Sequence, residues 1–332
     1  MARATIRDVA RVAGVSDATV SNTVNRPHLV NPATQDRVRQ AMETVGYVPN
    51  AAARALRVGR TRTLGLVVLD FGNPFFAEVA AGAEQAAVEA GAEVALFHTG
   101  LGENTREQRL LHRLAEWRLD GLVITPNDVD DPALTLIAER GTPVVVLARE
   151  VPSGRHSAVR SDDLLGGEIA ARHLLDHGHR RLAFAGWRRD ERYDGAARVA
   201  ATADTTLEWL DTGNADIAGG RAVGARLAGL PSRRRPTAVF CANDLIAAGV
   251  IQQLTRYGLR VPDDLAVVGF DDTDLASAAS AVELTSVRQP AAEIGRAAVQ
   301  LVLDEVKDRN RRGRDMVFQP ELVIRESTAG RR

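Results

Sequence analysis

The 332-residue chain is poor in residues that several classes of protein require: it has one cysteine, Cys241, and only 4% aromatic residues. A single cysteine excludes an intramolecular disulfide and is typical of a reducing compartment. No run of about 18 apolar residues occurs, so no membrane-spanning helix is expected. No apolar segment follows the basic N-terminus, so we predict no signal peptide. We therefore expect a cytoplasmic protein that has no membrane partner.

Lysine is also nearly absent, since Lys307 is the only one, and arginine carries the positive charge. Residues 1–62 contain ten arginines and four acidic residues, a formal charge of +6, although the whole chain has a net charge of −1. The remainder is therefore acidic. A small basic head on an acidic body indicates that the head alone contacts a polyanion; a chance bias of surface charge is the alternative.

The basic head begins with two short helices joined by a glycine turn. Thr5 is predicted to cap the first helix, and Gly14 supplies a backbone that can end it. Ser16 is predicted to cap the second helix, whose buried face we expect to contain Val20 and Val24. Two helices joined in this way form a helix-turn-helix, whose second helix fits the major groove of DNA.

The outward side chains of the second helix suit base and phosphate contacts. Asn22 can pair with adenine, Ala18 can contact a thymine methyl group, and the neighbouring hydroxyls suit phosphate oxygens. Asp17 is electrostatically unfavourable against DNA. It is either a reader of cytosine or a partner of the helix dipole, and the sequence leaves both interpretations open.

A third helix is expected from Asn31-Pro32 to Gly46, and a short basic run, AAARALR, follows Pro49-Asn50. About seven residues cannot form a stable helix alone in water, so this run requires a partner, either its symmetry mate or DNA. Leu56 has the chemistry of an apolar wedge for a minor-groove step. A flexible linker is the alternative.

Together, ATIRDVARVAGVSDATVSNTVN, VNPATQDRV and METVGYVPNAAARALR resemble the head and hinge of the LacI/GalR family of bacterial transcriptional regulators. The resemblance implies a homodimer on a palindromic, double-stranded DNA operator, with paired hinge helices in the minor groove and Leu56 opening the central step. It places base specificity at Asp17, Ala18 and Asn22. The expected DNA-binding residues are Thr5, Ser16, Asp17, Ala18, Thr19, Ser21, Asn22, Asn25, Asn50, Ala53, Arg54 and Leu56.

From Thr63 onwards, apolar strands alternate with amphipathic helices, a pattern that predicts parallel sheets covered on both faces. The body resembles the periplasmic sugar-binding-protein fold that this family joins to its head. The predicted fold is an all-α helix-turn-helix head plus an α/β body of two doubly wound parallel-sheet subdomains. The expected strands are 64–69, 93–98, 121–125, 143–147, 181–185, 237–241, 265–269, 316–318 and 322–324, and the expected helices are 75–90, 105–118, 132–140, 166–178, 244–257 and 290–307.

The chain is too long for one simple core, so several domains are expected. The fold that the resemblance implies also crosses between the two halves of the body. The expected boundaries are 1–49 for the head, 50–60 for the hinge helix and linker, 61–160 with 290–320 for the N-subdomain, and 161–289 with 321–332 for the C-subdomain.

Polar residues recur just past the predicted strand ends, where ligands bind in doubly wound folds. Carboxylates, amides and arginines around aromatic side chains suit a polyhydroxylated ligand such as a sugar; for any single residue, a helix cap is the alternative. The resemblance places most of these residues at effector positions. The expected effector-binding residues are Asp70, Asn73, Phe75, Phe76, Arg149, Asp162, Arg192, Asp194, Arg198, Phe240, Asn243, Asp271 and Gln289.

Two departures from the family pattern affect the expected cleft wall. Ala148 precedes Arg149, where the family often has an Asp-Arg pair, and the segment between Arg198 and Pro236 is several residues short. The effector class is therefore open between a sugar, which the amides and carboxylates favour, and a nucleobase.

Two other motifs resemble ligand-binding or metal-binding sites but are not interpreted as such. Residues 100–105, GLGENT, only approach a dinucleotide-binding fingerprint, because Thr105 stands at the third glycine position. His173, His177 and His179 lie together near a helix end without a nearby cysteine. No spacing of residues indicates a catalytic nucleophile. We therefore expect no cofactor, no metal site and no enzymatic activity.

The basic head, the short hinge and the two-lobed body predict a DNA-binding repressor that responds to a small molecule, with a sugar as the most favoured effector. A solute-binding protein without a regulatory role is the rival. It would require an export signal and would not require a head.

Overall fold

The computed structural model describes residues 4–48, 61–152, 155–187, 190–274, 276, 282–308 and 313–329. The chain forms two compact units, Met1–Thr61 and Arg62–Arg332, which are called the head and the body. None of the described helices has both the length and the apolar character that crossing a membrane requires.

The head contains α1 (Ile6–Ala13), α2 (Asp17–Asn25), a short 3-10 helix, η1 (Pro27–Leu29), and α3 (Pro32–Val45). The residues that were predicted to cap and end its helices do so. The Thr5 side chain accepts the backbone N–H of Asp8 in a capping box, Ser16 and Asn31 cap α2 and α3, and Gly14 ends α1 in the left-handed region at a φ of 65°. The core of the head consists of Val9, Ala10, Val20, Val38 and Ala41.

The buried face of α2 differs from the prediction at one position. Val20 is buried as expected, but Val24 is only half-buried, and Thr23 is buried instead. The Thr23 hydroxyl donates a hydrogen bond to the Thr19 carbonyl at 2.9 Å. That bond lets a polar side chain occupy a core position, which hydrophobic periodicity alone does not indicate.

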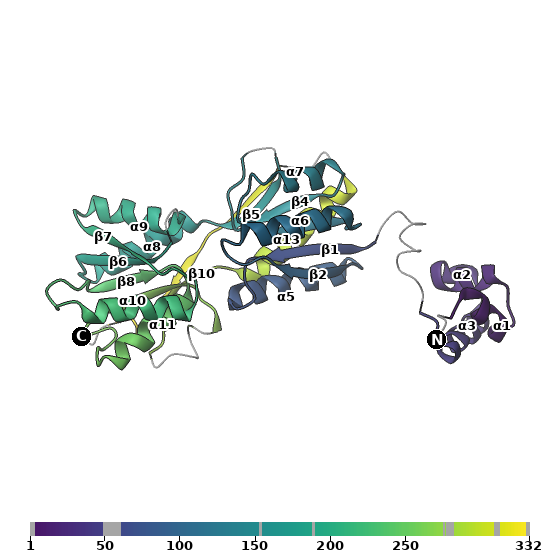
Figure 1. Ribbon diagram of the computed structural model, residues 1–332, viewed down its shortest axis with the longest axis horizontal. Coiled ribbons are helices and arrows are strands. Elements are labelled where there is room, and N and C mark those ends of the chain that lie inside the picture. The colour runs from purple at the N-terminus through teal and green to yellow at the C-terminus, as the bar shows by residue number, and fades with distance from the viewer. Residues whose placement is uncertain are drawn as a thin grey trace. The chain divides into compact units, whose positions relative to one another are not determined.

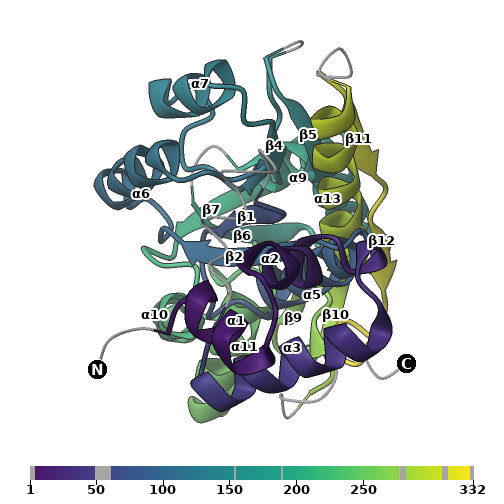
Figure 2. The ribbon, with the colours of Figure 1, turned by 90° about the vertical axis from the view of Figure 1, so that its right-hand side faces the viewer.

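The first lobe of the body is a six-stranded parallel sheet in the order β11-β5-β4-β3-β1-β2. Helices α5 and α13 pack on one face, and α6 and α7 pack on the other, as Figure 2 shows. The elements are β1 (Thr63–Val68), β2 (Glu93–His98), β3 (Gly121–Ile124), β4 (Val144–Leu147), β5 (Ser157–Ser161), β11 (Asp315–Phe318), α5 (Pro74–Glu89), α6 (Asn104–Glu116), α7 (Pro132–Glu139) and α13 (Ala291–Lys307).

The second lobe is a sheet in the order β12-β10-β9-β8-β6-β7, parallel except for the antiparallel edge strand β12. Figure 1 shows α8 and α9 on one side of the strands and α10 and α11 on the other. The elements are β6 (Arg181–Gly186), β7 (Thr206–Asp211), β8 (Ala238–Cys241), β9 (Ala266–Asp271), β10 (Thr285–Arg288), β12 (Glu321–Val323), α8 (Asp163–Asp176), α9 (Glu191–Thr202), α10 (Ile217–Gly229) and α11 (Asp244–Arg256).

The chain passes between the two lobes three times: after β5, after β10, and between β11 and β12. Both lobes are therefore built from separate stretches of sequence, and the carboxyl ends of several strands from each sheet lie near the crossings. The fold class is the predicted one: a helix-turn-helix unit and an α/β body of two doubly wound sheets.

Five elements of the body were not predicted: β5, β7, β10, α9 and α10. Strand β7 is an edge strand in which only Leu210 is buried, so it lacks the continuous apolar run of the inner strands. Helix α10 contains several glycines, which lower intrinsic helix propensity.

Close helix packing explains those glycines. Helices α10 and α11 approach so closely that a Cβ atom on Gly220 would lie 2.2 Å from the carbonyl oxygen of Ile246. The pairs α5–α13 and α8–α9 show the same arrangement. A Cβ on Gly295 would lie 2.0 Å from the Val79 carbonyl oxygen, and one on Gly167 would lie 2.0 Å from that of Arg192. Tertiary packing thus requires glycine inside helices whose local propensity it weakens.

We predict that Gly295→Ala lowers the free energy of unfolding of the body by about 1–3 kcal/mol, because the new methyl group must displace the backbone of α5. Gly229→Ala is the matched control, since a Cβ there meets nothing within 4 Å at the end of α10. Urea denaturation followed by circular dichroism measures both variants. Equal stabilities for the two variants would contradict the packing argument.

Candidate functional sites

Several predicted DNA-contacting side chains of α2 already bond within the head. The Ser16 hydroxyl oxygen accepts the backbone N–H of Thr19 at 3.1 Å and lies 2.9 Å from the Thr19 hydroxyl. The Asn25 amide donates to the Ser21 carbonyl oxygen at 2.7 Å. These bonds hold the polar side chains in fixed positions at the two ends of α2, as contacts that set the position of a helix on phosphates require.

The N-terminal end of α2 carries a pair of opposite charges. Asp17 Oδ2 lies 3.7 Å from Nε of Arg7 on α1, and these side chains are 56% and 88% exposed. Arg7, which was not predicted to be a DNA-binding residue, therefore offsets part of the unfavourable charge of Asp17. Ala18 is exposed beside this pair, and Asn22 is half-buried. The predicted contacts at Asn50, Ala53, Arg54 and Leu56 lie outside the described residues.

The body encloses a cavity of about 380 Å³ between the strand ends of the two lobes. Most of the residues in its wall are polar, and both lobes contribute to it. Nine of the thirteen predicted effector residues line the cavity: Asp70, Asn73, Phe75, Phe76, Arg149, Arg192, Asn243, Asp271 and Gln289.

The other four predicted residues do not line the cavity. Asp162 caps α8 by accepting the backbone N–H of Leu165 at 2.9 Å. Asp194 and Arg198 are exposed on α9, away from its buried face. Phe240 is buried inside the sheet on β8, where its ring centroid lies 5.3 Å from that of Phe184. These four assignments are corrected: one residue is a helix cap, two face solvent, and one belongs to the core.

Asp271 is a buried carboxylate in the cavity wall. Its side chain is buried at the end of β9, and its Oδ2 atom accepts a hydrogen bond from the Asn73 amide of the first lobe at 3.2 Å. Its Oδ1 atom accepts another from Gln289, at the crossing into α13, at 2.7 Å. Burial raises the pKa of Asp271 to about 6. Its backbone has a φ of 103°, a strained conformation for a residue with a side chain.

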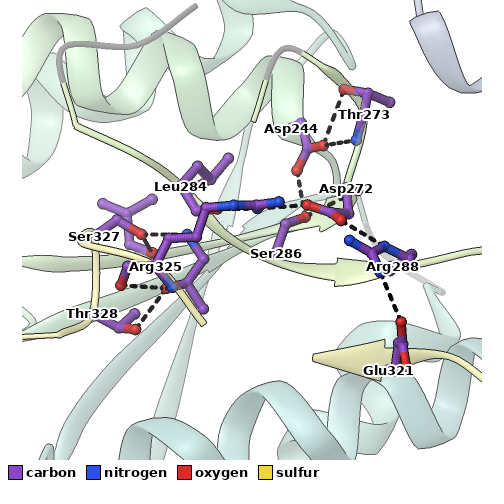
Figure 3. A network of polar contacts seen from close by, with 12 residues as sticks. Asp244, Asp272, Thr273, Leu284, Ser286, Arg288, Glu321, Arg325, Ser327 and Thr328 are labelled. Atoms are coloured by element: carbon purple, nitrogen blue, oxygen red, sulfur yellow. Dashed lines mark hydrogen bonds and ion pairs between the residues drawn. The ribbon is translucent and has the colours of Figure 1, made fainter. Parts of the chain in front are cut away.

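Figure 3 shows the polar network that holds the loop after Asp271. Asp272 accepts hydrogen bonds from Arg288 Nε at 2.7 Å and from Arg325 at 2.5 Å. Its backbone N–H donates to the Ser286 hydroxyl oxygen at 3.1 Å, and that hydroxyl donates to Asp244 at 2.6 Å. The network joins the C-terminal segment, β10 and α11 to the loop. It therefore stabilises the strained backbone that places Asp271 in the cavity.

Arg192 is held firmly in the second-lobe wall. Its Nε and one terminal nitrogen donate to Asp163 Oδ2 at 3.1 and 2.9 Å, and another terminal nitrogen donates to the Ala242 carbonyl oxygen. The guanidinium lies 4.1 Å from the centre of the Phe270 ring. Burial disfavours its charge, yet the neighbouring carboxylates of Asp163, Asp190 and Asp271 raise its pKa above the ordinary value.

Asp190 has one satisfied and one unsatisfied oxygen. Its Oδ1 atom caps α9 by accepting the backbone N–H of Arg192 at 3.0 Å, whereas Oδ2 is buried and has no hydrogen-bond partner among the described residues. Burial raises the pKa of Asp190 to about 6. Asp190 is not among the predicted effector residues, although an aspartate directly before the helical segment ERYDGAAR is a signal of a helix cap. Other unpredicted cavity residues are Thr125, Glu150, Arg160, Ser161, Asp163, Glu191 and Asp216.

Ala148, which departs from the family pattern, and His173, which belongs to the histidine cluster, both have structural roles. Ala148 adopts a left-handed backbone at a φ of 53° and lines the cavity beside Arg149. His173 bonds to the Thr328 hydroxyl at 2.8 Å, and burial together with His177 lowers its pKa to about 4. Within the described ranges, no group of His, Cys, Asp and Glu residues has the arrangement of a metal site.

A helix-turn-helix head joined to a two-lobed body with a polar cavity defines a class of regulators that combine DNA binding with ligand sensing. Residues 5–50 match the lacI family of bacterial regulatory proteins, and residues 171–328 match the periplasmic binding protein-like domain. The chain is 36% identical over 337 residues to the HTH-type transcriptional repressor PurR of Aliivibrio fischeri, with 99% of each chain covered. It therefore belongs to the LacI family, as a transcriptional repressor and not an enzyme.

Two solved structures extend this similarity. The transcriptional regulator CelR in complex with cellobiose is 31% identical, with a TM-score of 0.71 over 98% of this chain and 100% of that one. The lac repressor dimer bound to operator and the anti-inducer ONPF is 25% identical, with a TM-score of 0.84 over 99% and 100% of the chains.

We predict that Asp190→Asn stabilises the body at pH 8. The pKa of Asp190 rises from 3.8 to about 6 on folding, so the folded chain binds more protons than the unfolded chain between these values. Stability therefore falls as the pH rises through this window. Asparagine retains a capping oxygen without the buried charge, and the expected gain is about 3 kcal/mol.

Thermal denaturation between pH 4 and pH 8 measures this effect. The gain from Asp190→Asn should disappear towards pH 4, where the wild-type carboxyl group is also neutral in the folded chain. Asp194→Asn, on the same helix but exposed to solvent, is the control. A variant that is less stable than wild type at pH 8 would show that the charge of Asp190 stabilises the fold.

Proposed function

We propose that this repressor binds a palindromic operator as a homodimer, and that a small polyhydroxylated ligand in the cavity changes its affinity for the operator. The hydrogen bond between Asn73 of the first lobe and the Asp271 carboxylate of the second lobe carries this proposal. A ligand that bonds to Asp271 competes with this contact between the lobes. Such a ligand favours one arrangement of the lobes over another, and ligand binding is thereby coupled to a change of conformation.

In this proposal, residues 1–49 bind DNA, and residues 50–60 form a hinge whose stability depends on its partners. Asp17, Ala18 and Asn22 contact bases, and Leu56 wedges into the minor groove. The lac repressor dimer, solved with its operator, supports this division of roles through its similarity over the whole chain. The remaining residues divide into an N-subdomain, 61–160 with 290–320, and a C-subdomain, 161–289 with 321–332.

The cavity favours a sugar or sugar derivative over a nucleobase. A planar base binds best between aromatic faces, and Phe75, Phe76 and Trp187 line the cavity, but carboxylates and amides outnumber these aromatic side chains in its wall. Hydroxyl groups, by contrast, can pair with Asp271, Asn243 and Asp190. The cellobiose complex of CelR supports this choice through its similarity in fold and sequence.

Selection of bound sequences from a random double-stranded DNA library tests operator binding. The full chain should enrich one palindromic sequence. We predict that Asn22→Ala weakens binding to that sequence by about 1–3 kcal/mol, because a bidentate base contact is lost, and leaves non-specific binding unchanged. Gln40→Ala, exposed on α3, is the control. Failure of the wild-type chain to enrich any palindrome, with or without ligand, would contradict the proposed function.

The exposed edge strand of the first sheet, β2, supports the proposal that the chain forms a homodimer. Strand β2 is exposed or half-buried at every position, unlike the inner parallel strands, which are buried. Leu96 on β2, Phe71 and Trp117 are 44%, 48% and 49% exposed. Leu96 and Phe71 line a groove together with residues of α6, and Trp117 directly follows α6. An exposed apolar sheet edge is a pairing surface, and a second copy of the chain can cover it around a two-fold axis.

We predict that Leu96→Glu converts the dimer to monomer, because two-fold symmetry places the buried charge in the interface twice. The expected loss is about 2 kcal/mol or more for each copy. Leu136→Glu, on the exposed part of α7, is the control that should remain dimeric. Analytical ultracentrifugation distinguishes the two. A Leu96→Glu variant that stays dimeric would place the dimer interface elsewhere.

A further inference from the structure

The charges on the cavity wall are unbalanced. Arg192 is paired with Asp163 at 2.9 Å and with Asp190 at 3.9 Å, and Arg160 is paired at 3.0 Å with Asp315, which does not line the cavity. Arg149 is the one cavity arginine without a hydrogen-bond or ion-pair partner among the described residues. Beyond Asp163 and Asp190, five further carboxylates line the same wall: Asp70, Glu150, Glu191, Asp216 and Asp271.

Helix N-termini around the cavity are already occupied. Free backbone N–H groups at a helix start bind phosphate readily. Here Asn73 accepts the N–H of Phe75 at the start of α5, Asp190 caps α9, and Asp216 accepts the N–H of Gly219 at the start of α10. These caps place the protein's own oxygen atoms where the phosphate of a ligand would bind. A phosphorylated ligand would therefore meet carboxylates and capped helices, with Arg149 alone to oppose its charge.

Buried polar atoms on the wall lack partners within the part of the chain that the structure describes. Asp190 Oδ2, Thr125 Oγ1, Ser161 Oγ and Arg160 Nε are buried without a hydrogen bond, and all four residues line the cavity. The side chains of Asp190, Thr125 and Ser161 are at least nine-tenths buried. An ionised carboxylate can only accept, so Asp190 Oδ2 requires a donor. The two hydroxyls and the guanidinium nitrogen suit the hydroxyl groups of the same ligand.

Building on the proposed function, we infer that the effector is a polyhydroxylated ligand that carries a protonated amine and no phosphate or carboxylate, as an amino sugar does. An ammonium group supplies three donors and a positive charge to the acidic wall near Asp190 and Asp271. A neutral sugar supplies donors but leaves the excess negative charge in place. An anionic sugar adds to that excess. Burial raises the pKa of both aspartates, and the charge of Arg192 acts in the opposite direction on each.

Isothermal titration calorimetry on the full chain tests this inference with matched sets of sugars. Each set shares one skeleton and contains the neutral sugar, the 2-amino sugar, its N-acetyl form and the 6-phosphate; glucose, galactose and mannose supply three sets. The N-acetyl form keeps the nitrogen but removes the charge. In at least one set, the amino sugar should bind about tenfold more tightly than the neutral and N-acetyl forms, because its hydrogen bonds are charge-assisted. The 6-phosphate should not bind.

The variant Asp190→Asn tests whether the preference for an amino sugar depends on the carboxylate of Asp190. This variant should reduce the advantage of the amino sugar over its neutral parent, whereas Glu139→Gln, outside the cavity on α7, should leave it unchanged. Neutral sugars that bind as tightly as their amines, a 6-phosphate that binds, or an absence of binding by every amino sugar would each overturn the inference. The operator selection decides the proposed function separately, because it measures DNA binding by the head.

Discussion

The buried carboxylate of Asp271 is the constraint on which the rest of the body depends. Removing a charge from water is expensive, and here hydrogen bonds from Asn73 and Gln289 offset part of that cost. The first donor belongs to the opposite lobe, and the second lies at a crossing between lobes. In the proposed function, a ligand that bonds to Asp271 competes with this contact between the lobes. The two arginines on Asp272 hold the strained backbone behind it.

The same architecture explains why the cavity is acidic. Doubly wound sheets bring strand ends and helix starts to one edge, and carboxylates are favoured at helix starts as caps and as partners of the helix dipole. Asp190 and Asp216 are both caps and cavity residues. At Asp190 this arrangement leaves a buried, unsatisfied oxygen, a local loss of stability at the position where the proposed ligand would bind. Stability and function are therefore in opposition at this residue.

Helix caps and hydrophobic patterns in the sequence predicted the helices of the head better than they predicted which residues line the cavity. Thr5, Ser16 and Asn31 cap helices in the manner their side chains dictate, and the apolar strands of both lobes are visible as continuous runs. Helix α10 was missed because its glycines serve a neighbouring helix, a cause that lies in tertiary packing. Phe240 and Asp162 were misplaced for the same kind of reason. Whether a residue near a strand end faces the core, a helix start or the cavity depends on distant segments.

The most direct test of the account compares the affinity of the cavity ligand for the free chain and for the chain bound to its selected operator. Coupling between two binding sites is reciprocal, so a ligand that changes operator affinity must itself bind the two forms differently. If the cavity controls the head, the two dissociation constants of the ligand, measured by calorimetry, differ by at least about fivefold. Equal dissociation constants would show that the cavity does not control the head, and would contradict the account.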